Sequence, residues 1–220
     1  MGALWRQRQP RGLRRMTKAS AKRTEALTRC PWAGNDAEYQ RYHDEEWGVP
    51  LSNDRALFEK LCLEGFQAGL SWVTILRKRE NFRRAFDRFE PQRVARYGAK
   101  DIARLMQDAG IVRNRAKIEA TIDNAKTYLC LRKRGTLQAF LWDFLDEGPV
   151  QNRHRAMADI PTETELSRRI SKALKAEGFR FVGSTTMYAF MQSVGMVNDH
   201  LLGCHRYATC QKLQRASAAP

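Results

Sequence analysis

The stretch LMQDAGIVRNRAK, residues 105–117, contains the apolar end of one helix, a glycine turn at Gly110 and the polar start of a second helix. The second helix opens with Arg113, Arg115 and Lys117, although cations at a helix N-terminus oppose the helix macrodipole. A bound phosphate would remove that penalty, so Gly110 and these three side chains form a candidate phosphate-binding turn. The alternative is a solvated basic turn between two core helices.

Helical periodicity extends from this turn toward both ends of the chain. Apolar residues recur at three-to-four spacing within 57–63, 82–89, 101–108, 114–131, 136–146, 163–177 and 185–196. Residues 162–165 (TETE) form a capping-box pattern that opens one of these helices, and Gly178 suits its end. Only residues 179–182 have strand character, and they are too few for a sheet. The sequence therefore predicts an all-α, compact globule of about seven to nine short helices.

Charge is distributed over a basic N-terminal segment and a domain that is basic on its own. The chain of 220 residues holds 39 Lys and Arg against 24 Asp and Glu, a net charge of +15. Such an excess is typical of proteins that bind nucleic acid. We expect a disordered basic extension over 1–29, a single helical domain of one or two lobes over 30–206, and a flexible tail over 207–220.

Cysteine usage and hydropathy limit the cellular context. The chain has five cysteines, an odd number, and no secretory signal with an apolar segment precedes them, which argues against a disulfide framework. No run of about 18 apolar residues predicts a membrane span. We therefore expect a cytoplasmic protein without a membrane partner, associated with the nucleoid if the source is bacterial.

Four residues with metal-binding side chains form two pairs at opposite ends of the ordered chain. Cys30 and His43 lie near its start, and His200 and Cys204 are four residues apart, a spacing that places both on one helical face. Two thiolates and two imidazoles suit tetrahedral zinc, and a fully occupied ligand set is typical of a structural site. The alternative is two buried cysteines and two hydrogen-bonded histidines that do not meet.

Aromatic and acidic residues are concentrated in residues 32–47, which contain Trp32, Tyr39, Tyr42 and Trp47, and Trp72 follows. Aromatic rings stack on nucleobases, and a positively charged base adds a cation–π attraction. This cluster therefore predicts the lining of a base-binding pocket. The same residues would equally suit packing around the metal-bound end of the chain.

Glu64 interrupts the otherwise apolar stretch of residues 61–72. A buried carboxylate costs free energy unless a cation or several donors satisfy it, and Gly65 and Gly69 would let a ligand approach the chain closely. A carboxylate that faces aromatic walls suits a cationic base. The alternative is a glutamate bonded to backbone amides or to an arginine.

Four motifs together resemble the 3-methyladenine DNA glycosylase I family, a constitutive alkylation-repair family of the helix-hairpin-helix group. They are RCPW at 29–32, YHDEEWGVP at 42–50, LEG with GLSW over 63–72, and VNDH at 197–200 followed by Cys204. The resemblance covers the chain from about Cys30 to Cys204. It implies an all-α helix-hairpin-helix fold and a monomeric enzyme that acts on double-stranded DNA containing alkylated adenine.

The resemblance also implies an activity and a set of site residues. The activity is hydrolysis of the N-glycosidic bond of N3-methyladenine after the base has been flipped out of the duplex. Glu64 would be the catalytic residue and, with Tyr42, would hydrogen-bond the base, while Trp72 would stack on it; Trp47 and Tyr39 are further candidates for base contacts. The implied cofactor is a structural Zn²⁺ held by Cys30, His43, His200 and Cys204.

The chain departs from the general helix-hairpin-helix pattern in two places. Val112 stands where a second hairpin glycine is typical, and nothing between Lys117 and Asp143 provides a Gly/Pro-rich loop that ends in a catalytic aspartate. The second absence is a feature of the resembled subfamily. No lysine in the pocket motif suggests a Schiff base, so we expect a monofunctional enzyme without strand cleavage. A zinc-stapled, non-catalytic DNA-binding module is the alternative, although it would not need a buried Glu64.

Overall fold

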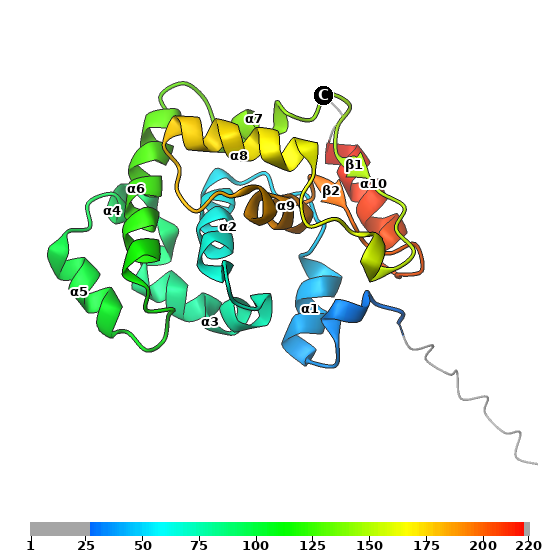
Figure 1. The fold of residues 1–220 in the computed structure, drawn as a ribbon, viewed down its shortest axis with the longest axis horizontal. Coiled ribbons are helices and arrows are strands. Elements are labelled where there is room, and N and C mark those ends of the chain that lie inside the picture. Colours follow the sequence, from blue (N-terminus) through cyan, green and yellow to red (C-terminus); the bar gives the residue numbers. More distant parts are fainter. Residues whose placement is uncertain (1–26, 218–220) are drawn as a thin grey trace, which may run out of the picture.

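Helices dominate residues 27–217, which are the residues that the computed structural model describes (Figure 1). Of the extension expected over 1–29, residues 1–26 lie outside them, while Arg29 pairs with Asp44. In chain order the elements are η1 (Pro31–Ala33), α1 (Ala37–Glu45), α2 (Asp54–Gln67), α3 (Trp72–Ala85), η2 (Asp87–Phe89), α4 (Pro91–Val94), α5 (Ala99–Gln107), α6 (Arg115–Leu131), α7 (Leu137–Trp142), β1 (Val150–Gln151), η3 (Met157–Asp159), α8 (Glu165–Glu177), α9 (Ser184–Ser193), β2 (Val197–Asn198) and α10 (Tyr207–Ser217). The predicted all-α class is confirmed.

The helix α2 lies at the centre of the fold and contacts α3, α6, α7 and α9. Its first turn is fixed by the N-cap Asn53, whose side chain accepts a hydrogen bond from the backbone N–H of Ala56. From Leu57 onward most of its side chains are buried. A helix that is apolar on nearly every side belongs in a protein interior, so Glu64 on this helix is removed from water by the packing around it.

The only strands in the described residues are β1 and β2, a parallel pair in which Val150 faces Val197. Residues 179–182, the only segment with strand character in the sequence, form an irregular loop, in agreement with the expectation that they are too few for a sheet. The backbone N–H and C=O of Arg180 bond to the side chain of Asn124, at 2.7 and 3.1 Å. These backbone groups are therefore satisfied without a neighbouring strand.

The ends of α8 are defined by local hydrogen bonds. Gly178 ends the helix with a φ of 105°, as predicted. The start differs from the expected TETE box, because the N-cap is Thr164 and its partner in the capping box is Ser167. Glu163 accepts hydrogen bonds from the side chains of Arg168 and Ser184 instead.

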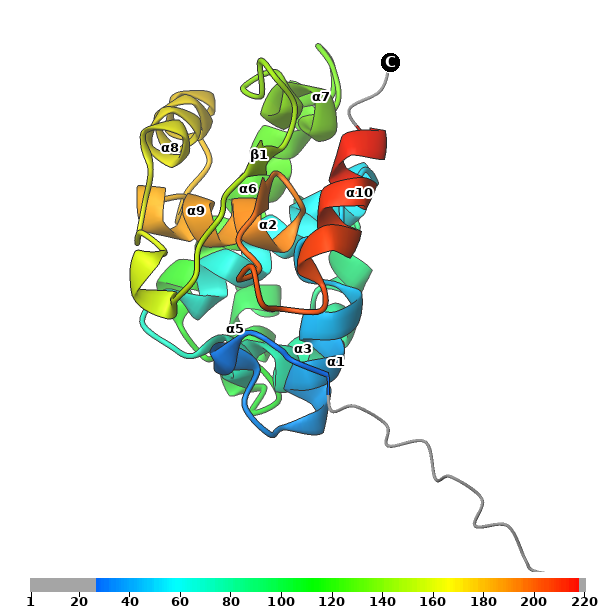
Figure 2. The same ribbon diagram turned by 90° about the vertical axis from the view of Figure 1, so that its right-hand side faces the viewer.

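The start of the described chain lies beside the loop that precedes α10, whereas the far end of α10 lies away from it (Figure 2). The backbone N–H of His205 donates to the carbonyl of Thr28 at 2.9 Å. The expected flexible tail needs correction over 207–217, which form α10. Its Gln214 is buried and donates to the carbonyls of Gly48 and Val197, at 2.8 and 3.3 Å. No helix within residues 27–217 is long and apolar enough to cross a membrane.

Candidate active site and metal centre

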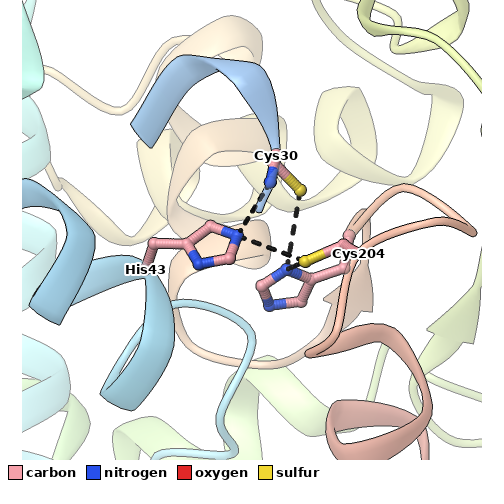
Figure 3. Close-up of side chains that lie close together, drawn as sticks. Cys30, His43 and Cys204 are labelled. Atoms are coloured by element: carbon pink, nitrogen blue, oxygen red, sulfur yellow. Dashed lines mark hydrogen bonds between the residues drawn. The ribbon is translucent and has the colours of Figure 1, made fainter. Parts of the chain in front are cut away.

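Cys30, His43, His200 and Cys204 form one buried cluster, with all four ligand atoms within 4.8 Å of one another (Figure 3). The Sγ of Cys204 lies 3.4 Å from Nε2 of His43 and 3.5 Å from Nδ1 of His200, which itself lies 3.7 Å from Sγ of Cys30. Zinc–sulfur and zinc–nitrogen bonds in a tetrahedron would separate such atoms by about 3.5 Å. The four residues meet, and the cluster can hold a metal ion.

A second layer of contacts orients both imidazoles toward this cluster. Nδ1 of His43 lies 2.8 Å from the carboxylate of Asp44, and Nε2 of His200 lies 3.0 Å from the carbonyl of Trp47. Each ring then has its other nitrogen facing the sulfur atoms. Arg29 donates to Asp44 at 2.7 Å and so anchors the carboxylate. Carboxylate and carbonyl partners of this kind are typical of metal-binding histidines.

The loop that carries two of the ligands is not helical. His200 and Cys204 were expected on one helical face, but they lie in turns between β2 and α10. The N–H of Cys204 donates to the carbonyl of Leu201 at 2.8 Å, and the N–H of Leu201 contacts Sγ of Cys30 at 3.4 Å. The hydrogen bond between Cys30 and Cys204 lowers the pKa of Cys204 and raises the pKa of Cys30, so the two sulfur atoms share one proton.

Beside the cluster is a pocket of about 310 Å³ enclosed by α1, α2, the start of α3, α9 and the segment around η3. It is lined by all five residues predicted to contact a base, namely Tyr39, Tyr42, Trp47, Glu64 and Trp72. The ring of Trp47 also lies 4.6 Å from the ring of His200. One set of rings therefore both packs on the cysteine–histidine cluster and lines the pocket, and binding of a base there stays a prediction.

Glu64 is 3% exposed and lies at the pocket wall. Its partner is neither an arginine nor a set of backbone amides. The ammonium of Lys60, one helical turn earlier, lies 3.4 Å from its carboxylate. Burial raises the pKa of Glu64 above its ordinary value, while Lys60 and a hydrogen bond from Ser193 oppose that rise. The site thus contains a carboxylate whose charge depends on a single cation.

Two hydrogen-bond donors at the pocket have no acceptor among the described residues. The indole Nε1 of Trp72 is buried without a hydrogen-bond partner among the described residues. The hydroxyl oxygen of Tyr42 accepts from Lys60 at 2.8 Å, and an ammonium cannot accept the hydroxyl hydrogen in return. Buried donors without partners cost free energy. A ligand with acceptor atoms, such as a purine edge, would satisfy them.

Sequence reasoning missed several pocket residues. Tyr188 and Gln192 of α9 line the pocket, and both donate to the buried carboxylate of Asp199, at 2.6 and 2.7 Å. The VNDH motif includes Asp199 but carries no signal of what it binds. Lys60 was also missed. Gly65 leaves room for Phe181 of the same chain rather than for a ligand, since an added Cβ would lie 3.2 Å from that side chain.

The turn between α5 and α6 lies where the sequence predicts it, but only two of its three cations are exposed. The N–H of Gly110 donates to Asp108 at 2.7 Å, while Arg113 and Arg115 are exposed. Lys117 is buried, which corrects its assignment as a phosphate contact. Its ammonium donates to the carbonyls of Phe66 and Ala68, at 2.8 and 2.6 Å, because a cation stabilises the C-terminal end of a helix, here α2.

Comparisons with known proteins agree with the motifs. A family model described as methyladenine glycosylase matches residues 32–207. The DNA-3-methyladenine glycosylase of Haemophilus influenzae is 51% identical over 178 residues, covering 80% of this chain and 96% of that protein. A crystal structure of 3-methyladenine DNA glycosylase I superposes with a TM-score of 0.80 at 47% identity, over 81% of this chain and 98% of the other.

A further structure, of 3-methyladenine DNA glycosylase I from Staphylococcus aureus, is described as the structural basis of 3-methyladenine recognition. It superposes with a TM-score of 0.79 at 38% identity, over 83% of this chain and 97% of that one. The residues that the family model matches, 32–207, include the pocket lining and His43, His200 and Cys204, while Cys30 lies just before them. The chain therefore belongs to the methyladenine glycosylase family.

Proposed function

We propose that this protein excises N3-methyladenine from alkylated double-stranded DNA by hydrolysing the N-glycosidic bond. Membership of this family makes the protein a DNA N-glycosylase. It therefore argues against the alternative of a non-catalytic DNA-binding module. The observation that carries the choice of substrate is Glu64, a buried carboxylate at the wall of an aromatic pocket. A base methylated at N3 is cationic while it is attached to the sugar. An anion among aromatic rings suits such a base better than a neutral one.

The pocket can hold a flipped-out base by stacking and by hydrogen bonds. The ring of Tyr42 lies 5.4 Å from that of Trp72, and both line the pocket. Stacking on such a ring contributes about 1–3 kcal/mol per base. The hydroxyl of Tyr42 supplies a donor for the base edge. Extrusion costs least for a damaged, poorly stacked base, which adds to selectivity.

Glu64 contributes to bond cleavage through its charge. As the glycosidic bond lengthens, positive charge moves from the base to the sugar, and a nearby anion in a site of low dielectric stabilises it. The methylated base is already a good leaving group and needs little protonation. Water then attacks the sugar. We assign Glu64 electrostatic stabilisation rather than strict general-base catalysis.

The enzyme should be monofunctional. A lyase reaction needs a lysine amine that reaches the sugar carbon. No lysine of the described residues lines the pocket, and the ammonium of Lys60 contacts Tyr42 and Glu64 instead. Excision should therefore leave an intact abasic strand.

DNA would bind across the basic turn between α5 and α6, the hairpin of the proposed helix-hairpin-helix motif. Arg113 and Arg115 are exposed at the start of α6, where a phosphate is favourable. Lys117 supports this arrangement indirectly, because its bonds to the carbonyls of Phe66 and Ala68 connect the start of α6 to the end of the helix that carries Glu64. The proposed setting is a monomer that acts on DNA in the cytoplasm.

The cysteine–histidine cluster would hold a structural Zn²⁺. Two sulfurs and two nitrogens complete a tetrahedron and leave no position for a reactive water. All four ligands are buried. The ion would join the segment before α1 to the loop before α10, and it would set the position of Trp47 at the pocket wall.

The experiment that tests the proposed function is release of bases from methylated DNA. The purified protein should release 3-methyladenine from duplex DNA treated with a methylating agent, detected by chromatography. The abasic product should remain uncut until alkali is added. DNA binding without any released base would support the non-catalytic module, and strand cleavage by the protein alone would contradict the monofunctional assignment.

A further inference from the structure

Lys60 contacts three of the residues assigned to base recognition. It lies on α2 with a side chain only 12% exposed, one turn before Glu64. Its Nζ is 2.8 Å from the hydroxyl oxygen of Tyr42, 3.4 Å from the carboxylate of Glu64 and 3.7 Å from the centre of the Trp72 ring. A buried lysine is uncommon unless it is paired. The Nζ atom thus makes an ion pair with Glu64, a hydrogen bond to Tyr42 and a cation–π contact with Trp72.

Lys60 does not itself line the base pocket. It lines a separate hollow of about 150 Å³ on the neighbouring side, which shares only Trp72 with the pocket. A base in the pocket would therefore meet Glu64, Tyr42 and Trp72, with Lys60 behind them. Any effect of the ammonium on the base must pass through these three side chains, which makes Lys60 a positioning residue and not a catalytic one.

The charge of Glu64 depends on this ammonium. Burial raises the pKa of Glu64, and Lys60 is the largest influence that lowers it again. In the other direction, burial lowers the pKa of Lys60 to about 8, although Glu64 and Glu46 favour its charged form. The other ionisable groups that face this cluster are Tyr39, Tyr42 and Glu46 from α1 and its end, Glu59 from α2, and Arg79 and Arg83 from α3.

None of these neighbours replaces Lys60 as a partner of Glu64. Arg79 is paired with Glu46 at 2.5 Å, and Arg83 is paired with Glu59 at 2.7 Å. Ser193 from α9 gives Glu64 a neutral hydrogen bond only. If Lys60 lost its charge, Glu64 would remain buried without a cation, and a carboxylate in that position takes up a proton.

We propose that Lys60 is a positioning residue for base excision, which keeps Glu64 anionic in the empty pocket and orients the hydroxyl of Tyr42. This inference rests on the proposed function of the same site. Because the ammonium donates to the oxygen of Tyr42, the hydroxyl hydrogen is left for an acceptor in the pocket. Excision should then be lost in acid, when Glu64 is protonated, and in alkali, when Lys60 is deprotonated, because the neutral amine can accept the hydroxyl hydrogen of Tyr42 that the base would otherwise receive.

The test is the pH profile of single-turnover release of 3-methyladenine from methylated duplex DNA, between pH 5 and pH 9. Wild-type protein should give a bell-shaped profile with an alkaline limb near pH 8. Lys60→Met, which keeps the length of the side chain, should lose the alkaline limb and shift the acidic limb upward. For each pH unit of that shift, the rate of Lys60→Met relative to wild type should fall about tenfold further at acidic pH than at alkaline pH.

Two further variants keep the test decisive. Lys60→Arg retains a cation that does not titrate in this range, so it should keep an acidic limb and lose the alkaline limb. Lys126→Met removes an exposed lysine of α6 that pairs with Asp123 at 3.7 Å, and it should reproduce the wild-type profile. Thermal melting of each variant identifies loss of folding.

The outcomes separate this inference from the proposed function. A Lys60→Met profile that superposes on the wild-type profile, or that is lower by one constant factor at every pH, would overturn the positioning role. Retention of the alkaline limb in Lys60→Arg would overturn it as well. In those cases wild-type protein still releases 3-methyladenine. Failure of the wild-type protein to release that base would instead contradict the proposed function.

Discussion

Trp72 is the residue whose replacement separates stacking from charge recognition. Trp72 is 7% exposed and lines the pocket together with Glu64. Trp72→Ala should weaken binding of free 3-methyladenine by about 1–3 kcal/mol, because one aromatic face is lost. Isothermal titration of the two proteins measures this difference. Trp142→Ala removes a half-buried tryptophan of α7 outside the pocket and should leave the dissociation constant unchanged. Equal dissociation constants for Trp72→Ala and wild type would contradict stacking.

Residue-level predictions succeeded where the chemistry of a single side chain was unusual for its surroundings. Glu64 is conspicuous in an apolar stretch, and the burial expected for it is confirmed. Lys60 has no such signal, because a lysine four residues before a glutamate is ordinarily a solvated pair on a helix surface. Its burial results from α1 and α3, which pack over this part of α2. Only the assembled fold brings those elements together.

At the level of elements, Lys117 connects two helices. Its ammonium donates to two carbonyls at the end of α2. The carbonyl of Phe66 is buried, and a buried carbonyl without a donor costs about 1–3 kcal/mol. Lys117→Met should therefore destabilise the protein, with a decrease in melting temperature of roughly 2–4 °C per kcal/mol for a chain of this size. Differential scanning calorimetry measures it.

Arg113→Ala is the matched variant for Lys117→Met, since Arg113 is exposed in the same turn. It should keep the wild-type melting temperature and lower the salt dependence of DNA binding by about one phosphate contact. An unchanged melting temperature for Lys117→Met, together with a reduced salt slope, would restore the phosphate assignment that the structure corrects.

Helix positions were predictable where apolar residues recur regularly. They were less predictable where hydrogen bonds of polar side chains determine the local structure. The 114–131 prediction matches α6, which begins at Arg115, because apolar residues recur along its length. The helix α10 was missed because its buried positions include the polar Gln214, whose partners are backbone carbonyls far away in sequence. Residues 179–182 have strand character but form a loop, since the side chain of Asn124 takes the place of a partner strand.

At the scale of the whole molecule, the cysteine–histidine cluster fastens the two ends of the domain. Cys204→Ala should lower the bound zinc and the melting temperature, by about 10 °C if the lost ligand contributes several kcal/mol. Plasma mass spectrometry of the metal and thermal melting measure both effects. Cys62→Ala removes another buried cysteine, from α2, and should keep the zinc. Full zinc content and an unaltered melting temperature in Cys204→Ala would contradict the structural role.

Sequence spacing alone left open whether these ligands meet, because Cys30 and Cys204 are separated by most of the chain. Ligand type made the pairing plausible, and the motif resemblance implied it, but the contact depends on α10 and on the β1–β2 pair. Asn198 of β2 donates to the carbonyl of Tyr207 at 3.1 Å, which places the ligand loop against α10. Contacts between residues so far apart in the sequence leave no mark on the local spacing of apolar residues.

The central claim is that an anionic Glu64 recognises and stabilises a cationic adenine. The most direct test is the rate of 3-methyladenine release from methylated duplex DNA by Glu64→Gln, which keeps the shape of the side chain and removes its charge. We predict a loss of about 10²- to 10³-fold, with wild-type melting temperature and zinc content. Release at the wild-type rate by the folded variant would contradict the claim.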